Sequence, residues 1–296
     1  AVSEFLLHIL CLAGIYAIIA LALNLQAGYA GLLNFGHIVF VGTGAYAVGL
    51  GNNFGLPLWV VIPAGLLCAI VISALMALLG RQLTADYWGI ATLALAEIIR
   101  IAVVNEDALT GGAQGIGGLS SPWSTGDTVT DTRIFAIIIL LSVIVATLAS
   151  LRIGASRFGR ALRLMREQPQ LAICMGYALP WLKCRALMSS AVMCCLAGML
   201  LAWYTDYVSP DYLLSSETFL IWSMVMIGGL GNVRGVLLGV LLVEGLYNFI
   251  PFAKDYFHIS SDLTGALRLG LVGLALLLCL LTRPGGLLPE KLRTFS

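Results

Sequence analysis

The sequence predicts an all-α membrane protein, a polytopic helical bundle in which some helices are broken. Of its 296 residues, 60% are apolar and 10% are charged, whereas soluble domains hold roughly 45–50% apolar and about 25% charged residues. The apolar residues form long unbroken blocks rather than the alternating pattern of a membrane β-barrel. Glycine-rich segments interrupt two of these blocks. We therefore expect one membrane domain over residues 1–296.

The apolar blocks predict the spanning helices in chain order. A spanning helix needs about 20 predominantly apolar residues. The blocks with a helical length and pattern are residues 4–25, 36–50, 57–79, 86–104, 133–151, 186–205, 217–230, 235–249 and 265–281. This gives about nine spans.

The basic residues predict the orientation of these spans. Residues 152–185 hold seven of the 16 Lys and Arg side chains, while the connections 105–132 and 206–217 carry acids and neither Lys nor Arg. Cytoplasmic loops are enriched in Lys and Arg. We therefore expect the 152–185 loop and the C-terminus in the cytoplasm. Nine crossings then place Ala1 outside, which predicts either a tenth helix upstream or one miscounted short segment.

Two polar, glycine-rich breaks interrupt the apolar blocks. The first holds Asn24, Gly28, Gly31, Asn34 and His37, and the second holds Gly229 and Gly231. Irregular backbone at membrane depth persists only where protein or a wet cavity satisfies its polar groups, and paired breaks in two halves of a chain point to a transport pathway. The alternative is that the glycines only let helices pack closely.

Two ionisable residues lie inside the span at 86–104. Glu97 and Arg100 are three residues apart, so they share one helix face and can form an ion pair. They are expected either to lock the helix as a structural pair or to belong to the pathway or its gate. Glu244 has no ionic partner near it in sequence, and it must find one in space, stay protonated or face water.

The basic loop contains a pattern typical of a short helix. Pro169 and Gly176 bracket the segment, and Leu171, Cys174 and Met175 fall on one face between them. Such an apolar face among charges suits insertion into a groove of a soluble partner. The alternative is a helix that lies flat on the membrane, with its arginines on lipid headgroups.

Several chemistries have no motif in this chain. It holds no Gly-Lys dipeptide, and so no phosphate-binding loop, no Gly-x-Ser-x-Gly elbow and no His-Glu-x-x-His site. The seven cysteines sit mostly within apolar runs and are interpreted as packing residues. We expect no enzyme activity, no bound cofactor or metal and no nucleic-acid partner.

Four segments resemble the inner-membrane permease subunits of bacterial branched-chain amino acid ABC importers, of the LivM type. They are residues 23–37 with 42–46, 87–100 with 110–116, 159–176, and 226–235. The resemblance implies an ABC importer permease fold with a weak internal repeat. It also implies a LivH-type second permease, two LivG- and LivF-type ATPases that bind ATP and Mg, and a periplasmic binding protein. The segment after Gly159 resembles the one that docks on an ATPase, and the candidate coupling residues are Gly159, Arg160, Arg163, Glu167, Leu171, Cys174, Met175 and Gly176.

Two other functions remain open at this point. The same machine could carry urea, amides or aromatic amino acids instead of leucine, isoleucine and valine. A self-sufficient, ion-coupled transporter could instead use Glu97, Glu244 and His37, although such a carrier would not need the basic loop.

Overall fold

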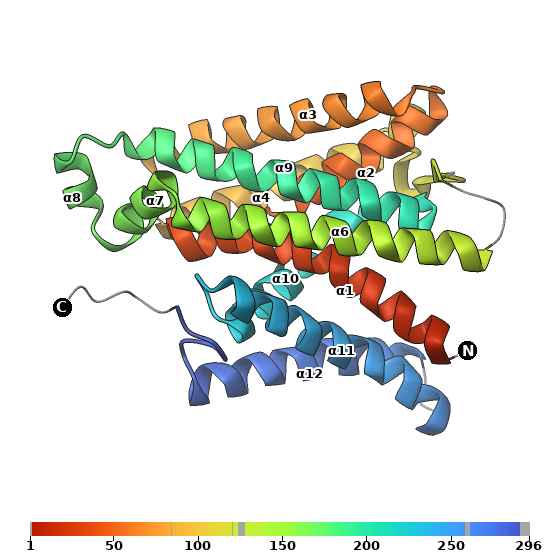
Figure 1. Ribbon diagram of the computed structural model, residues 1–296. Coiled ribbons are helices and arrows are strands. Elements are labelled where there is room, and N and C mark those ends of the chain that lie inside the picture. Colours follow the sequence, from red (N-terminus) through yellow and green to blue (C-terminus); the bar gives the residue numbers. More distant parts are fainter. Residues whose placement is uncertain (1, 84, 120, 124–127, 258–260, 291–296) are drawn as a thin grey trace.

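The computed structural model describes residues 2–83, 85–119, 121–123, 128–257 and 261–290. Its long helices run side by side along one direction (Figure 1). The short helices α7 (Arg157–Glu167) and α8 (Pro169–Cys174) project at one end of the bundle, and the N-terminus lies at the other. We call the end with α7 and α8 the basic end, because it carries the arginines of α7.

Each predicted helix has a counterpart at nearly the predicted position. The long elements are α1 (Val2–Asn24), continued by a π-helical turn η1 (Leu25–Tyr29), α2 (Ile38–Asn53), α3 (Leu58–Leu79), α4 (Ala85–Asn105), α6 (Thr128–Ala155), α9 (Leu179–Thr205), α10 (Ser215–Gly228), α11 (Val233–Phe257) and α12 (Ser261–Thr282). The sequence-based boundaries differ most at α9, which begins seven residues earlier than predicted, and at α11, which ends eight residues later.

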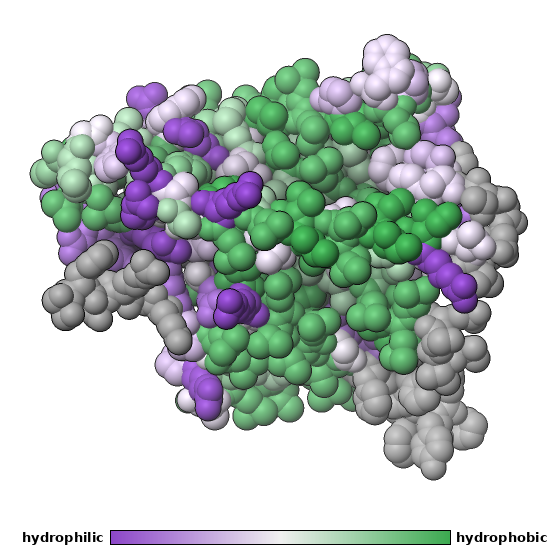
Figure 2. Space-filling model, viewed as in Figure 1, coloured by the Kyte–Doolittle hydropathy of each residue, from purple (hydrophilic) through white to green (hydrophobic). Residues whose placement is uncertain are grey.

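The long apolar helices confirm a multi-pass membrane protein. Among the described residues, five helices are long and apolar enough to cross a membrane: Leu6–Tyr29, Leu58–Leu79, Tyr87–Asn105, Thr130–Ala155 and Leu179–Thr205. Figure 2 shows a broad hydrophobic surface across the middle of the molecule, with hydrophilic residues gathered toward the basic end. This is the surface expected of a bundle whose middle lies in lipid.

Two of the predicted spans are helices too short to cross the hydrocarbon of a membrane, and we call them half-helices. α2 has 16 residues and α10 has 14, so at 1.5 Å per residue α10 is only about 21 Å long, against about 30 Å of hydrocarbon. Both begin in the middle of the bundle, where Ile38 N donates to Thr218 Oγ1 at 3.4 Å. Residues 30–37 lead into α2, and residues 209–214 lead into α10.

The two halves of the chain pack in the same way with opposite direction. α1 and α9 are antiparallel, since Ser190 of α9 donates to the carbonyl of Ala22 at 2.9 Å. α2 packs along α9, and α10 packs along α1; in the same manner α3 packs on α9 and α11 packs on α1. The arrangement is that of an inverted repeat, with each half-helix lying against the long helix of the other half.

Glycines allow the closest helix crossings. A Cβ on Gly44 of α2 would collide with the carbonyl of Cys195 in α9, and one on Gly198 would collide with the carbonyl of Val41. In α10 and α11, Gly228 and Gly235 each lie against the other's carbonyl. These four positions show the close packing that small residues permit in membrane helices.

Two connections pair at the end opposite the basic end. β1 (Ile116–Gly117) and β2 (Tyr207–Val208) form a two-residue antiparallel ladder, with Ile116 opposite Val208. The short helix α5 (Asp107–Thr110) and the turn η3 (Gly112–Gln114) precede β1, and η4 (Pro210–Leu213) follows β2. The acid-bearing, glycine-rich connections are therefore ordered in the part of them that the structure describes.

Candidate translocation and coupling site

The first break is held by a buried amide network. Gln26 Nε2 donates to Ser190 Oγ at 2.6 Å, and Asn34 Nδ2 donates to Gln26 Oε1 at 3.0 Å. All three side chains are fully buried. Because the α-helical ladder ends here, these amides and the Ser190 hydroxyl tie the irregular segment back to α1 and α9.

Asn34 also organises the start of α2. Its Oδ1 accepts from Gly36 N at 2.9 Å, and its backbone carbonyl accepts from Trp222 Nε1 of α10 at 3.0 Å. α4 closes the same segment, since Phe35 N donates to Thr92 Oγ1 at 3.1 Å and a Cβ on Gly36 would collide with the carbonyl of Thr92. The break therefore contacts α4 and α10 directly.

His37 lies at the first turn of α2 and is fully buried. Its Nε2 lies 3.2 Å from the carbonyl of Ile19 and 3.0 Å from Cys194 Sγ. Its Nδ1 has no hydrogen-bond partner in the part of the chain that the structure describes. His37 thus joins the middle of α1 to the middle of α9 at the point where α2 begins.

The second break is joined to the first and to the C-terminal tail. Asn24 Oδ1 accepts from Gly231 N at 2.8 Å. Leu287 N donates to the carbonyl of Ile227 at 2.9 Å, and Leu288 N donates to that of Gly228 at 3.1 Å. Gly229 and Gly231 both have positive φ, +118° and +81°, which favours glycine. The tail is thus bound along the loop between α10 and α11.

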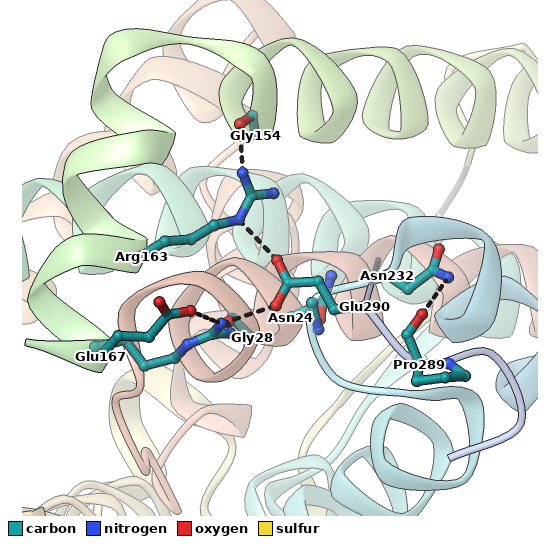
Figure 3. Close-up of polar contacts among 10 residues, drawn as sticks. Asn24, Gly28, Gly154, Arg163, Glu167, Asn232, Pro289 and Glu290 are labelled. Carbon is teal, nitrogen blue, oxygen red and sulfur yellow. Dashed lines mark hydrogen bonds and ion pairs between the residues drawn. The ribbon is translucent and has the colours of Figure 1, made fainter. Parts of the chain in front are cut away.

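An ionic cluster connects this tail to α7, and we call it the Glu290 clasp (Figure 3). Glu290 Oε1 lies 2.7 Å from Arg163 Nε, and Oε2 accepts from Arg166 Nη2 at 2.8 Å. Arg166 Nη1 donates to the backbone carbonyl of Gly28 in η1. Arg163 donates to the Gly154 carbonyl at 3.1 Å and lies 4.6 Å above the ring of Tyr29. The clasp comprises Arg163, Arg166 and Glu290.

The electrostatics of the clasp favour its charged form. Burial lowers the pKa of the Arg166 guanidinium, but hydrogen bonds to Glu290 and to Glu167 outweigh this effect and raise the pKa above its ordinary value. The Glu290 side chain is only 15% exposed. Because Glu167 also pairs with Arg166, two arginines face two carboxylates, and the Gly28 and Gly154 carbonyls accept further N–H groups of the arginines.

Three of the predicted pathway glycines surround this cluster. A Cβ on Gly31, which has φ +68°, would lie 2.8 Å from Arg166 Cγ, and one on Gly231 would lie 2.5 Å from Glu290 Oε2. A Cβ on Gly28 would lie 2.6 Å from Gly231 N. At these positions the absent side chain is required by the close approach of α7, the tail and the second break.

The predicted intramembrane ion pair is formed. Arg100 Nε donates to both oxygens of Glu97 at 3.0 Å, and the side chains are 25% and 41% exposed, respectively. They therefore lie partly on the outer surface of α4. Glu244 is 3% exposed and accepts from Asn248 Nδ2 at 2.8 Å. Asn248 lies one helical turn after Glu244. It is an uncharged partner, whereas the prediction named an ionic partner, protonation or contact with water.

The predicted coupling loop forms two helices. Ser156 Oγ caps α7 by accepting from Gly159 N at 3.1 Å, and α7 buries its apolar face. α8 follows as predicted, beginning at Pro169, and Gly176 with φ +84° lies just past its end. The exposed apolar side chains around α8 form what we call the α8 ridge, comprising Leu171 (45% exposed), Ile173 (59%) and Met175 (64%).

The other coupling candidates are distributed around this ridge. Cys174 is exposed beside it, and Arg160 is exposed on α7 with Nη1 bound to the Ala155 carbonyl at 2.8 Å. Glu167 is 48% exposed and pairs with Arg166. Arg163 points instead into the Glu290 clasp. The structure thus divides the predicted set into a surface group and an internal group.

Glu290, which binds both arginines of the clasp, is not among the residues predicted from the sequence. Glu290 is the only acid in the C-terminal segment after Arg283, and this was the signal available. Its partners, Arg163 and Arg166, are more than 120 residues away in the chain. Among the described residues, no group of three His, Cys, Asp or Glu side chains is placed to hold a metal ion.

Comparison with known proteins agrees with the sequence resemblance. Residues 5–280 match the family model described as branched-chain amino acid transport system / permease component. The chain is 29% identical to the Escherichia coli high-affinity branched-chain amino acid transport system permease protein LivM, over 97% of this chain and 71% of the relative. It is also 29% identical to a probable LivM of Methanocaldococcus jannaschii, over 94% and 91%. Escherichia coli LivH is 24% identical over 92% and 91%. No solved structure matches.

Proposed function

The chain belongs to the branched-chain amino acid transport permease family, and on that premise we propose how its structure serves transport. It is a permease subunit of an ABC importer for branched-chain amino acids, a machine with a second, related permease. The proposal concerns the partners, the orientation, the pathway and the coupling surface.

The partners we propose are a LivH-type permease, two LivG- and LivF-type ATPases that hold ATP and Mg, and a periplasmic binding protein. This chain would contribute no enzyme activity and bind no cofactor itself. We place it in the bacterial inner membrane with the basic end and the C-terminus in the cytoplasm. The concentration of arginines on α7 supports this orientation.

The α8 ridge is the observation that carries the ATPase assignment. Leu171 and Ile173 in α8 and Met175 just past its end are exposed at the basic end, and a helix of six residues cannot be stable alone. The capped α7 packs against α8, so these side chains are held at a fixed position. Exposed apolar side chains on a short helix suit a groove in a soluble partner. The coupling residues are then Gly159, Arg160, Arg163, Glu167, Leu171, Cys174, Met175 and Gly176.

The pathway is proposed to run along α4 and the two breaks. α4 contacts the first break through Thr92 and carries Glu97 and Arg100 on its partly exposed side. A charged pair is costly against lipid, so we infer that the second permease or the pathway covers it. Behind α4, the two half-helices meet and can change their relative position. The residues assigned to the pathway or its gate are Asn24, Gly28, Gly31, Asn34, His37, Glu97, Arg100, Gly229 and Gly231.

Isolation of the intact complex tests this assignment. A tagged chain purified in mild detergent is expected to bring down a second permease and two ATPases, which mass spectrometry identifies. In liposomes, the complex with its binding protein should accumulate labelled leucine, isoleucine or valine only when ATP is supplied. Purification of the chain alone, together with ion-driven flux from the pure chain, would instead support a self-sufficient carrier.

A further inference from the structure

The Glu290 clasp connects α7 to both breaks through charged side chains, in addition to the direct packing of α7 on η1. Arg166 contacts the π-helical turn of α1 through the Gly28 carbonyl and contacts the tail through Glu290. The tail is bound in turn to the loop of the second break by Leu287 and Leu288. One carboxylate therefore lies between the loop that carries the α8 ridge and the ends of both broken helices (Figure 3).

The geometry points to Glu290 as a positioning residue that transmits movement of α7 to the two breaks during transport. This inference rests on the proposed function, since it requires a partner that moves α8. It adds a residue and a segment, the C-terminal tail, that the coupling and pathway assignments do not include.

The backbone of both breaks packs closely around the Glu290 clasp. Three glycines of the two breaks lie next to the clasp: Gly28, Gly31 and Gly231. A Cβ on any of them would collide with the clasp or with a residue beside it. A displacement of the Arg166 side chain must therefore displace backbone in both breaks. Close-packed interfaces transmit such shifts because they are poorly compressible.

The charges of the Glu290 clasp require a carboxylate at position 290. Each oxygen of Glu290 faces a different arginine, Arg163 at 2.7 Å and Arg166 at 2.8 Å. An amide in its place would lose the negative charge that pairs with both arginines and would present an NH₂ group to one of them. The Glu290→Gln variant keeps the volume of the side chain and removes its negative charge.

The experiment uses the assembled complex in liposomes and measures leucine uptake and ATP hydrolysis together. Glu290→Gln is expected to leave the complex assembled and hydrolysing ATP, while uptake per ATP falls about tenfold, within the range of typical coupling between sites. Arg283→Gln is the matched control. It alters one exposed charge earlier in the same segment, away from the clasp, and should keep the wild-type ratio. Glu290→Asp should fall between Glu290→Gln and the wild type.

The outcomes separate this inference from the proposed function. If the wild-type complex transports and Glu290→Gln keeps the wild-type ratio of uptake to hydrolysis, the inference is wrong and the proposed function stands. Equal loss of uptake and hydrolysis would also overturn it, because a merely structural role predicts that result. Failure of the wild-type chain to bind ATPases would contradict the proposed function itself.

A second variant and a second measurement cover the case in which Glu290→Gln does not assemble. Arg166→Gln with Glu290→Gln leaves Arg163 on Tyr29 and the Gly154 carbonyl, and the same ratio is measured. Hydrogen exchange in the full complex then compares residues 157–167 with the second break, residues 227–232, with and without ATP. In the wild type both segments should change protection together, and in the double variant only residues 157–167 should change, because the tail that binds the second break is no longer held by α7. Joint change in the double variant would overturn the inference.

Discussion

At the residue scale, the buried polar side chains of the breaks serve the backbone. Asn24 and Asn34 accept hydrogen bonds from backbone N–H groups of the breaks, and Gln26 holds the Asn34 side chain in place. Polar groups buried without a partner are costly. These residues therefore permit the half-helices to exist, and any role in the pathway is added to that one.

Gly28 provides a test of the close approach between the two breaks. Gly28→Ala is expected to destabilise the chain by about 1–3 kcal/mol, the usual cost of overpacking, because its Cβ would lie 2.6 Å from Gly231 N. The measurement is the thermal unfolding temperature in detergent. Gly245→Ala is the control, since a Cβ there meets nothing within 4 Å. Equal unfolding temperatures for the two variants would contradict this account.

Glu97 and Arg100 provide a second test at this scale. Glu97→Gln leaves the Arg100 charge without its carboxylate and should reduce the amount of assembled complex. The double variant Glu97→Gln with Arg100→Leu removes both charges and should restore assembly. If the pair is only a structural lock, the double variant also transports. If the pair belongs to the pathway or gate, the double variant assembles and does not transport, as measured by leucine uptake in liposomes.

At the element scale, short helices perform the tasks that distinguish this bundle from a simple set of spans. α7 is capped by Ser156 and fixed by its buried apolar face, so it supports α8 on a rigid base. α2 and α10 place two helix starts in the middle of the bundle. Ile38 N donates to Thr218 Oγ1 and Trp222 Nε1 donates to the Asn34 carbonyl, and these hydrogen bonds keep the two starts together.

The α8 ridge is tested by one charged and one conservative substitution. Ile173→Asp should abolish binding of the ATPases and ATP-driven uptake, because a carboxylate cannot enter an apolar groove without a large desolvation cost. The two permease subunits should still purify together. Ile173→Val is the control and should transport normally. Retention of the ATPases by Ile173→Asp would show that α8 does not dock on them and would favour a helix that lies on the membrane.

At the scale of the whole molecule, the inverted repeat makes the two halves equivalent in packing but not in connection. α3 lies on α9 as α11 lies on α1, while α6 to α8 form a connection between the halves. Because this connection bears the basic loop, only one end of the bundle is suited to a cytoplasmic partner.

Cysteine labelling tests this orientation. A cysteine-free chain with Arg157→Cys, exposed at the basic end on α7, should react with a membrane-impermeant maleimide only after cells are permeabilised. A cysteine-free chain with Gln114→Cys, exposed at the opposite end, should react in intact cells. Reversed labelling of the two positions would invert the proposed topology.

Composition and local spacing were enough to predict the fold class, the positions of the helices and the short helix from Pro169 toward Gly176. Each of these depends on composition and spacing within a few turns, because the membrane selects apolar blocks and Pro and Gly limit short helices. The ion pair of Glu97 and Arg100 follows from the same local spacing.

Long-range packing determines which of the short segments remain short and what the glycines of the breaks contact. Residues 36–50, 217–230 and 235–249 are predicted as helices of similar length, but only the first two remain short, as α2 and α10, whereas the third belongs to the 25-residue α11. The Glu290 clasp could not be predicted from the sequence either, because it joins residues more than 120 positions apart. Contacts between distant segments depend on how helices pack, and no local pattern in the chain specifies that packing.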